Sequence, residues 1–488
     1  MKNLLKIFLY SLLILIISLM INTHFYIPQK QTIPEPIQIE INTDTVKNRL
    51  AEVLRFKTIS NQDPSLFDAT EFKQMHEFLE NSFPLLFSSL EKEMVNQHSL
   101  LFTWQGKNPQ LKPILFLAHQ DVVPVPAENL PAWTHPPFDG VIDADYIWGR
   151  GALDDKSSMM GIFEAVTFLL EEGFQPERTI YLAFGHDEEV IGTQGAAKIA
   201  ALLTERGIEL EFVLDEGGII ADGMTPGLEP AVAMVGIAEK GFLTLKLSVK
   251  VQGGHSSMPP KHTAVGIISQ AIVDLEANPF PVNSSHSMVY FDTIGPHMSY
   301  SKRLVFANYW LFKPLLEMQL GKAKNTNSMI RTTTAATMFD SGIKDNVLPV
   351  SAEAVVNFRI LPGETVESVK QYVSQVINNP EIKITGTGRN PSGISNINST
   401  SFKLLTETIH QANGGGALIV APYLVLGATD SRNFEGLTNN IYRFLFNYVN
   451  PDDLKRIHSI DERISIDNYE KVIKFYYQLM KNSDRLGT

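Results

Sequence analysis

Five short motifs in this chain contain the residue types that bind a pair of metal ions. They supply two histidines and several carboxylates, and they occur in a fixed order along the chain. Each motif alone is a weak signal, because such residues are common at strand and helix ends. The ordered set predicts metal-assisted hydrolysis of an amide. The motifs are His119–Asp121, Gly149–Lys156, His186–Glu189, Leu214–Gly218 and Arg456–Ser459.

The first metal ion is expected to bind His119, Asp154 and Asp215. His119 ends an apolar run, and Asp121 can orient its imidazole by accepting the second ring N–H. Asp154 follows a Gly-Arg-Gly turn, and its two oxygens can bridge two cations. Either Asp215 or Glu216 completes the shell; we prefer Asp215 and keep Glu216 as the alternative.

The second metal ion is expected to bind Asp154, Glu189 and His458. Glu188 is expected to be the catalytic base, because a residue that takes up a proton must not be occupied as a ligand. The chain has no cysteine, so every ligand atom is nitrogen or oxygen. Two Zn²⁺ ions per subunit suit this set, and Mn²⁺ or Co²⁺ could substitute.

The N-terminal segment, residues 1–24, has the features of a signal anchor. Lys2 and Lys6 precede an apolar run from Ile7 to Ile21, close to the ~20 residues that span a bilayer. No clear Ala-x-Ala cleavage site follows, so we favour a retained anchor over a cleaved signal peptide. The lysines should stay in the cytoplasm, which places the catalytic domain on the periplasmic, extracellular or lumenal side. Cleavage of the segment would make the protein secreted.

Alternating strand and helix patterns predict an α/β fold. Apolar runs at 114–118, 179–184 and 212–214 end next to candidate ligands, which predicts a mainly parallel twisted sheet with helices on both faces. After residue 240 the pattern changes to that of an α+β layer. We expect a tether at 25–44, a catalytic domain at 45–240 and 390–485, and an inserted lid domain at 241–389. These 488 residues exceed one typical domain.

The motifs resemble those of the co-catalytic zinc family of aminoacylases, carboxypeptidases and desuccinylases. The resemblance covers nearly everything after about residue 45, and it is strongest to the branch of carboxypeptidase S and the N-fatty-acyl-amino-acid synthase/hydrolases. The segments 185–193, 330–335 and 456–460 carry it. The resemblance implies a cis peptide bond between Asp154 and Asp155.

The resemblance also implies roles for four residues outside the metal motifs. His255 would stabilise the oxyanion, from the partner subunit in dimeric relatives, so a homodimer through the lid is one expected assembly. Asn346 and Arg359 of the lid would grip the carboxylate of the substrate. Arg432 would lie in a substrate-facing loop, 427–432.

The expected function is an exported, membrane-anchored hydrolase that cleaves an amide next to a free carboxylate, in a small peptide or an N-acyl amino acid. The alternative is an N-fatty-acyl-amino-acid hydrolase/synthase, and the apolar stretch 280–330 bears on it: its side chains either pack a small core of the lid or line an acyl pocket. A non-catalytic metal-binding protein would have no use for Glu188, and a membrane-tethered scaffold leaves the motifs unexplained. The net charge of −12 disfavours nucleic acid as a partner.

Overall fold

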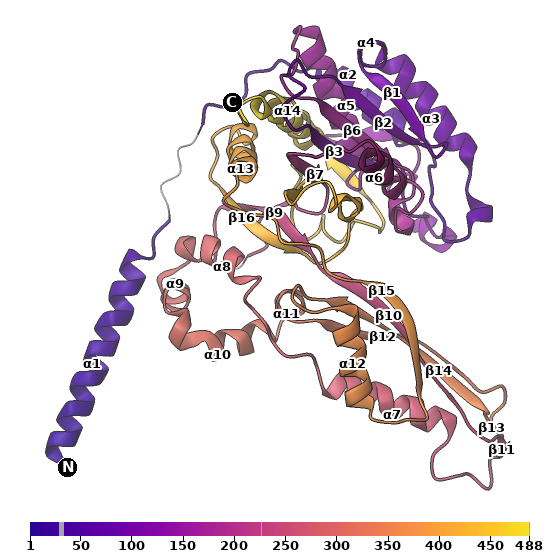
Figure 1. Ribbon diagram of the computed structural model, residues 1–488, viewed down its shortest axis with the longest axis vertical. Coiled ribbons are helices and arrows are strands. Elements are labelled where there is room, and N and C mark those ends of the chain that lie inside the picture. The colour runs from indigo at the N-terminus through magenta and orange to yellow at the C-terminus, as the bar shows by residue number, and fades with distance from the viewer. Residues whose placement is uncertain (29–33, 226, 488) are drawn as a thin grey trace.

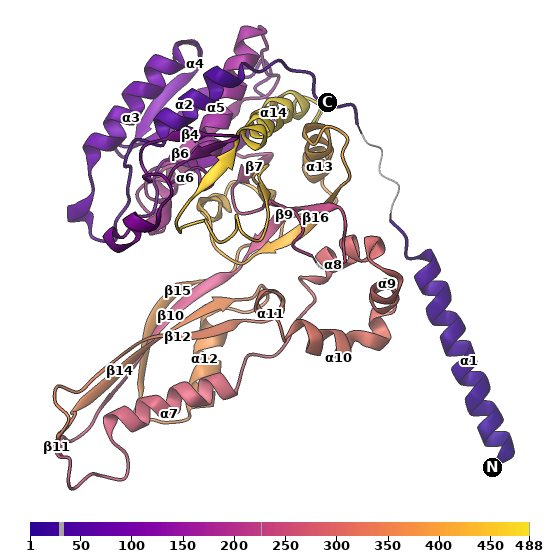
Figure 2. The same ribbon diagram turned by 180° about the vertical axis from the view of Figure 1, so that it is seen from behind.

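The computed structural model describes residues 1–28, 34–225 and 227–487. Positions 29–33 of the expected tether lie outside the described residues. Two sheets organise the chain: a ten-stranded sheet, which we call the large sheet, and a four-stranded antiparallel sheet, which we call the small sheet (Figure 1). Seen from behind, most helices gather around the large sheet, and the small sheet extends away from it (Figure 2).

The large sheet is parallel at its centre and antiparallel at its β1 edge. The strands β6, β3, β7 and β17 run parallel to one another, whereas β1 and β2 add antiparallel neighbours. This confirms the predicted α/β fold class. In spatial order the strands are β1 (Glu91–Val95), β2 (Ser99–Trp104), β6 (Ile180–Gly185), β3 (Ile114–His119), β7 (Phe212–Asp215), β17 (Ile441–Arg443), β9 (Ala231–Glu239), β8 (Ile220–Ala221) and β18 (Tyr448–Val449), with β16 (Leu418–Val425) parallel to β9.

Alternate residues of the central strands point to opposite faces of the large sheet. In β3, Ile114 and Phe116 join the core under α5, α13 and α14, whereas Leu115 and Leu117 join the core under α6. Both faces are therefore apolar, as in other parallel sheets that helices cover. Each such side chain contributes about 1.5–3 kcal/mol when it is buried. The helices are α2 (Thr43–Val53), α3 (Ala69–Ser82), α4 (Pro84–Ser89), α5 (Lys156–Glu171), α6 (Ala196–Glu205), α13 (Thr400–Ala412) and α14 (Ile466–Ser483).

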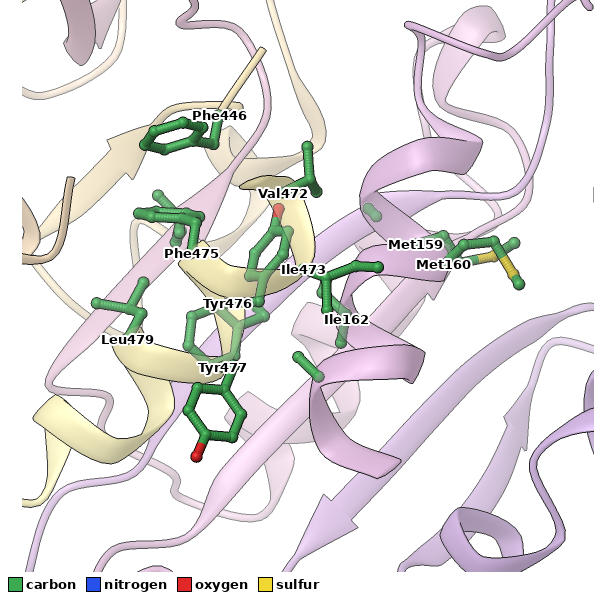
Figure 3. Packing of buried hydrophobic residues seen from close by; sticks show 14 of the residues in the cluster. Met159, Met160, Ile162, Phe446, Val472, Ile473, Phe475, Tyr476, Tyr477 and Leu479 are labelled. Carbon is green, nitrogen blue, oxygen red and sulfur yellow. The ribbon is translucent and has the colours of Figure 1, made fainter. Parts of the chain in front are cut away.

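The last helix, α14, packs on α5, the helix that follows the Asp154 turn. Figure 3 shows Ile473 and Tyr476 of α14 facing Ile162 of α5. Gly161 permits this close approach, because a Cβ atom there would lie 2.6 Å from Val472 Cγ1. The C-terminal part of the chain thereby supports the helix at the predicted centre.

The small sheet has helices on one face. Its strands occur in the order β12 (Thr333–Ser341), β14 (Ser351–Ile360), β10 (Gly241–Lys250) and β15 (Lys383–Arg389), and α7 (Ala264–Ala277) and α12 (Val366–Ile377) cover it. In β10 buried and less buried residues alternate, as the sequence pattern predicts. A short two-stranded antiparallel sheet of β11 (Gly254–His255) and β13 (Val347–Leu348) lies at the far tip (Figure 1).

The stretch 280–330 forms four α-helices, α8 (Met288–Ile294), α9 (Tyr300–Ala307), α10 (Tyr309–Leu320) and α11 (Lys324–Ile330), and a 3-10 helix, η4 (Gly295–His297). They do not form a core of the small sheet. Phe291, Ile294 and Leu316 instead pack with Ile419 and Ala421 of β16, on the large sheet. The stretch is therefore a helical layer between the two sheets and the N-terminal helix (Figure 1).

The N-terminal helix α1 (Lys2–Phe25) stands outside the rest of the molecule, and its C-terminal end lies beside α9 in both views (Figures 1 and 2). Among the described residues it is the one helix that is long and apolar enough to cross a membrane, by length and composition.

Candidate metal centre

The strand ends of the large sheet bring three of the motifs together. His119 is the last residue of β3 and pairs with Gly185, the last residue of β6. Asp215 ends β7, the parallel neighbour on the other side of β3. Because the carboxyl ends of adjacent parallel strands meet at one edge, the residues that follow them share that edge.

A three-stranded antiparallel sheet brings in the other two motifs. Its strand β5 (Tyr146–Trp148) leads into the turn of Asp154, and β19 (Arg463–Ser465) follows the loop of His458; β4 (Val141–Asp143) is the third strand. Trp148 pairs with Arg463. Backbone pairing therefore places His458 beside Asp154, although the two are far apart in sequence.

Two groups of potential ligand atoms share Asp154. Its Oδ1 lies 2.9 Å from His119 Nε2, and its Oδ2 lies 3.0 Å from His458 Nε2. His458 Nε2 also lies 3.2 Å from Glu189 Oε1. One carboxylate thus stands between two imidazoles, which fits a pair of cations bridged by a carboxylate. The groups are His119, Asp154, Glu216 and Asp154, Glu189, His458, and within each group the ligand atoms lie within 4.8 Å of one another.

Glu216 rather than Asp215 joins the first group. Glu216 Oε1 lies 3.7 Å from His119 Nε2, whereas Asp215 Oδ2 accepts the backbone N–H of Ser431 at 2.7 Å. The preference for Asp215 as the ligand does not fit this geometry, and the alternative, Glu216, does. Asp215 is the last residue of β7, whereas Glu216 lies in the bend that follows it.

Asp121 connects the first imidazole to the two glutamates. His119 Nδ1 lies 2.9 Å from the backbone carbonyl oxygen of Asp121, which leaves Nε2 facing Asp154. The buried carboxylate of Asp121 accepts the backbone N–H groups of Glu188 and Glu189, each at 3.1 Å, and Ser60 Oγ donates to it at 2.5 Å. Asp121 therefore fixes η3 (Glu188–Val190) relative to His119.

The centre concentrates carboxylates that are largely buried. Burial raises the pKa of Glu188 well above its usual range, and Asp430 and Glu189 add to the effect. Burial also raises the pKa of Glu216, and Asp154 adds to it. Bound cations would compensate this negative charge, so the electrostatics and the mixed nitrogen and oxygen donors both fit a metal pair.

A buried glutamate that sequence reasoning missed holds the turn of Asp154. Glu462 Oε1 accepts the backbone N–H groups of Gly151 at 3.0 Å, Leu153 at 2.9 Å and Asp154 at 3.3 Å. Its other oxygen lies 2.5 Å from Arg150 Nη1. The turn contains the cis peptide bond between Asp154 and Asp155 that the family resemblance implies. No pattern in the sequence distinguishes Glu462 from a surface acid.

His458 lies in an unusual backbone conformation. Its φ is +59°, in the left-handed region that residues with a Cβ atom rarely adopt. The loop is held further along by Asp461, whose carboxylate accepts the backbone N–H of Thr134 at 2.7 Å and its hydroxyl at 2.9 Å. Such conformations persist where the surrounding structure fixes them, and they concentrate at functional sites.

The lid residues of the prediction fall into two places. His255 and Asn346 are exposed at the tip of the small sheet, where Ser256 N donates to the backbone oxygen of Asn346. This tip lies far from the large sheet in both views (Figures 1 and 2), so the chain does not bring them to its own metal centre. Arg359, in β14, instead lies close to Arg432: loss of hydration and the charge of Arg432 lower the pKa of Arg359.

The loop of Arg432 is anchored by a second buried acid. Glu239 Oε1 accepts from Thr429 Oγ1 at 2.6 Å and lies 2.6 Å from Arg443 Nε. The same loop supplies Ser431, the partner of Asp215. Asp215 and Glu239 therefore hold the loop 427–432 against the large sheet, next to the metal groups.

A cavity of about 540 Å³ opens from the metal groups, within the range of roughly 300–1,000 Å³ for ligand pockets. Asp154 and Glu216 line one end. Ala428 and Thr429 of the substrate-facing loop line it as well. Much of the remaining wall is apolar and comes from the helices of the 280–330 stretch, namely Tyr290, Phe291, Ile294, Met298 and Met329.

Comparison with protein families decides the affiliation of the chain. The model of peptidase family M20/M25/M40 matches residues 115–482, which is most of the chain. The chain belongs to this family. The match includes every residue of both ligand groups, as well as Asp121, Glu188 and Glu462.

Two curated relatives extend over almost the whole chain. Probable carboxypeptidase S-like 2 of Dictyostelium discoideum is 41% identical over 99% of this chain and 95% of its own length. N-fatty-acyl-amino acid synthase/hydrolase PM20D1 of Xenopus tropicalis is 38% identical over the same shares of the two chains. A solved structure with the same fold is the M20 family metallo-carboxypeptidase Sso-CP2 from Sulfolobus solfataricus, with a TM-score of 0.64, 19% identity and 90% and 99% of the chains covered.

Membership of this family identifies the chain as a metal-dependent amide hydrolase. The predicted enzyme class and the predicted resemblance to carboxypeptidase S and the N-fatty-acyl-amino-acid synthase/hydrolases are confirmed. The names of the relatives state different substrates. Family membership alone therefore does not show whether this chain cleaves a peptide or an N-acyl amino acid.

Proposed function

We propose that this chain is a di-zinc hydrolase of small peptides or N-acyl amino acids. His119, Asp154 and Glu216 would hold one ion, and Asp154, Glu189 and His458 the other. The observation that carries the proposal is the placement of Asp154 between two imidazoles. Zinc is supported by the mixed imidazole and carboxylate donors, and Mn²⁺ or Co²⁺ would be accepted by the same atoms.

Glu188 is proposed as the general base. When bound, the two ions polarise the scissile carbonyl and lower the pKa of a water molecule. Glu188 belongs to neither group of potential ligands, so its carboxylate is available to take the proton of that water and pass it to the leaving amine. Asp121 positions His119, a proposed metal ligand, and Glu188, the proposed base, because it contacts His119 and holds the backbone of Glu188.

The substrate is proposed to carry a free carboxylate next to the amide. Arg359 and Arg432 support this, because loss of hydration lowers the pKa of Arg359 and repulsion from the neighbouring charge of Arg432 lowers it further. A bound carboxylate would relieve the repulsion and can accept two parallel hydrogen bonds from one guanidinium. Arg432 lies in the same loop as Ala428 and Thr429, which line the cavity, three residues after Thr429.

A panel of matched substrates tests this proposal. We expect zinc-dependent hydrolysis of dipeptides or N-acyl amino acids and much weaker hydrolysis of the same compounds with an amidated carboxylate. Arg359→Ala should raise KM for the free acids and leave the amides nearly unchanged. Equal losses on both substrate types would assign Arg359 a structural role, and hydrolysis that is indifferent to zinc and to chelators would overturn the proposal as a whole.

A fatty-acyl substrate is the second candidate, and the cavity favours it. The wall that Tyr290, Phe291 and Ile294 of α8 and Met329 of α11 provide is apolar and adjoins Asp154. Each methylene group of an acyl chain buried there would add about 0.8 kcal/mol. kcat/KM should therefore rise steeply from acetyl to oleoyl derivatives of one amino acid. A flat or falling series, with faster cleavage of dipeptides, would exclude the fatty-acyl substrate, and carboxypeptidase activity would be the only candidate that remains.

The proposed division of the chain follows the two sheets. Residues 45–240 and 390–485 would form the catalytic domain, and residues 241–389 the lid. A homodimer through the lid is supported by β12, an edge strand that exposes Met338 and Phe339. It is also supported by His255, which lies at the exposed tip and not at the metal centre of its own chain. The partner's lid would bring the equivalent histidine to the site.

The catalytic domain is proposed to lie outside the cytoplasm, held by α1. The support is the length and apolar composition of this helix and the lysines at its start, Lys2 and Lys6. Among the described residues, the polar contacts of α1 with the rest of the chain lie at its C-terminal end, where Asn22, Thr23 and the following residue Tyr26 meet the helical layer. The remainder of the helix is free to be surrounded by lipid.

A further inference from the structure

The helix α10 has an apolar side that no other part of the described chain covers. Trp310, Leu311, Pro314, Leu315 and Met318 are exposed and recur every three to four residues, so they form one stripe along the helix. On the opposite side, Leu316 and Leu320 are buried in the core that α8 and β16 share. The outward stripe is therefore not required for the packing of the helical layer.

This stripe begins where α1 meets the helical layer. Asn308, the residue before α10, is buried; its Nδ2 donates to the backbone oxygen of Leu19 at 3.1 Å, and its Oδ1 accepts from Asn22 Nδ2 at 3.0 Å. Thr23 is buried in the same contact. Satisfied polar side chains of this kind hold helices together at a membrane. The start of α10 is therefore tied to the last two turns of α1.

The contact fixes the depth of α10 relative to a bilayer. Leu19 lies six residues before the end of α1, which corresponds to about 9 Å of helix rise. Interfacial helices lie with their apolar side about 5–10 Å into the boundary of headgroups and acyl chains. If α1 spans the hydrocarbon layer, the start of α10 therefore lies at the depth of such a helix; α9 lies beside the C-terminal end of α1, and α10 follows α9 (Figure 1).

The charge of the segment suits an anionic lipid surface. Residues 295–324 contain five basic residues, Lys302, Arg303, Lys313, Lys322 and Lys324, against one acidic residue, Glu317, a net charge of +4, whereas the whole chain has a net charge of −12. Basic residues beside an exposed apolar stripe with a tryptophan are typical of helices that bind anionic membranes.

We propose that α10 docks on an anionic lipid bilayer, with Trp310, Leu315 and Met318 inserted, as a second membrane contact beside α1. The docked helix would form the back of the cavity wall, because its inward residues Leu316 and Leu320 share a core with the cavity residues Phe291 and Ile294. An apolar acyl substrate would then be taken up close to the lipid. That consequence rests on the proposed fatty-acyl function, but the docking itself does not.

Trp310 offers a direct test, because it is 62% exposed and the other three tryptophans, Trp104, Trp133 and Trp148, are at most 8% exposed. The full chain is reconstituted in phosphatidylglycerol vesicles that contain lipids brominated on the acyl chains. Docking predicts that the bromolipids quench the Trp310 emission, identified as the difference from Trp310→Phe, and that aqueous iodide does not.

A paired variant separates docking from simple attachment through α1. In Leu315→Glu/Met318→Glu, both altered side chains are more than half exposed, so the fold should persist while the stripe becomes acidic. We expect this variant to lose the bromolipid quenching and to gain iodide quenching, while α1 keeps it in the vesicles. The control Ile343→Glu, at the exposed tip of the small sheet, should behave like the unaltered chain.

Three outcomes would overturn the proposal. Quenching of Trp310 by iodide but not by bromolipids in the unaltered chain would place the stripe in water. Protection from both quenchers would mean that another protein surface, such as a second copy of the chain, covers it. Bromolipid quenching that survives Leu315→Glu/Met318→Glu would show a proximity imposed by α1 alone. None of these measurements uses hydrolytic activity, so they stand or fall independently of the proposed function.

Discussion

Asp154 shows how a single side chain can organise the centre. Its two oxygens face different imidazoles, those of His119 and His458. The backbone around it is held by Glu462, so the carboxylate has little freedom to turn. A ligand that is already in place loses less side-chain entropy when it binds an ion, which favours tight binding of the pair.

At the residue scale, the division between ligand and base leads to a sharp prediction. Glu188→Ala should retain its bound metal and lose about 10²–10⁴-fold or more in kcat, because proton transfer is removed while the ligands remain. Asp154→Ala should instead lose metal, since both groups share it. Metal content and kcat are measured on the same preparations. If Glu188→Ala loses metal as readily as Asp154→Ala, Glu188 is a ligand.

The choice between two neighbouring acids gives a second prediction. Glu216→Gln should lower the metal content from about two ions per chain toward one, because the first group loses a carboxylate. Asp215→Asn should keep both ions, since its amide oxygen can still accept the N–H of Ser431. Elemental analysis of dialysed protein distinguishes them. Loss of metal in Asp215→Asn but not in Glu216→Gln would restore the sequence-based assignment of Asp215.

The sequence was sufficient to place most of these residues and insufficient for this choice. His119, Asp154, Glu189 and His458 are recognisable because they lie in motifs that occur in a fixed order along this chain and resemble those of a known family. Asp215 and Glu216 are chemically equivalent in the motif, and only the direction of each side chain at the end of β7 separates them. Glu462 gave no signal at all, because its role depends on a backbone turn that lies beside it only in the folded chain.

At the element scale, the three-stranded sheet explains why a distant histidine reaches the centre. β5 and β19 pair in register. Glu462, the residue before β19, then holds the turn that follows β5. Continuous apolar runs predicted the central strands, and helical periodicity predicted the helices between them. Neither signal could predict the three-stranded sheet, since strands of three residues have too few positions to show a pattern.

The pairing of Arg150 with Glu462 should therefore be a major contributor to stability. Both side chains are almost completely buried, so Glu462→Ala would leave a buried guanidinium without its partner, at a cost of about 3–5 kcal/mol. We expect a lower midpoint of thermal unfolding and a weaker hold on metal. Glu52→Ala, which breaks a surface ion pair with Arg55, is the control and should cost at most about 1 kcal/mol. Similar midpoints for both variants would contradict the assigned role of Glu462.

At the scale of the whole molecule, the helical layer of residues 280–330 connects three features that were predicted independently of one another. It packs on β16, it lines the cavity, and it meets the end of α1. The sequence left two roles open for its apolar residues, packing a small core of the lid or lining an acyl pocket. In the structure Phe306 and Leu316 pack in a core shared with β16 of the large sheet, whereas Tyr290, Phe291 and Met298 line the cavity as well. Apolar composition alone cannot separate these roles, because each needs the same residue types.

This arrangement makes a prediction about the anchor. A chain without residues 1–24 should be released from membranes by high salt and should keep its hydrolytic activity, because the polar contacts of α1 with the rest of the protein involve the helical layer and not the metal centre. Salt weakens surface electrostatic contacts but not a spanning helix, so the full chain should stay with the membrane under the same wash. Protease added from outside the cytoplasm should digest the catalytic part of the full chain and spare a tag placed before Lys2. A full chain that instead appears outside the cell as a shortened, freely diffusing form would identify residues 1–24 as a cleaved signal peptide.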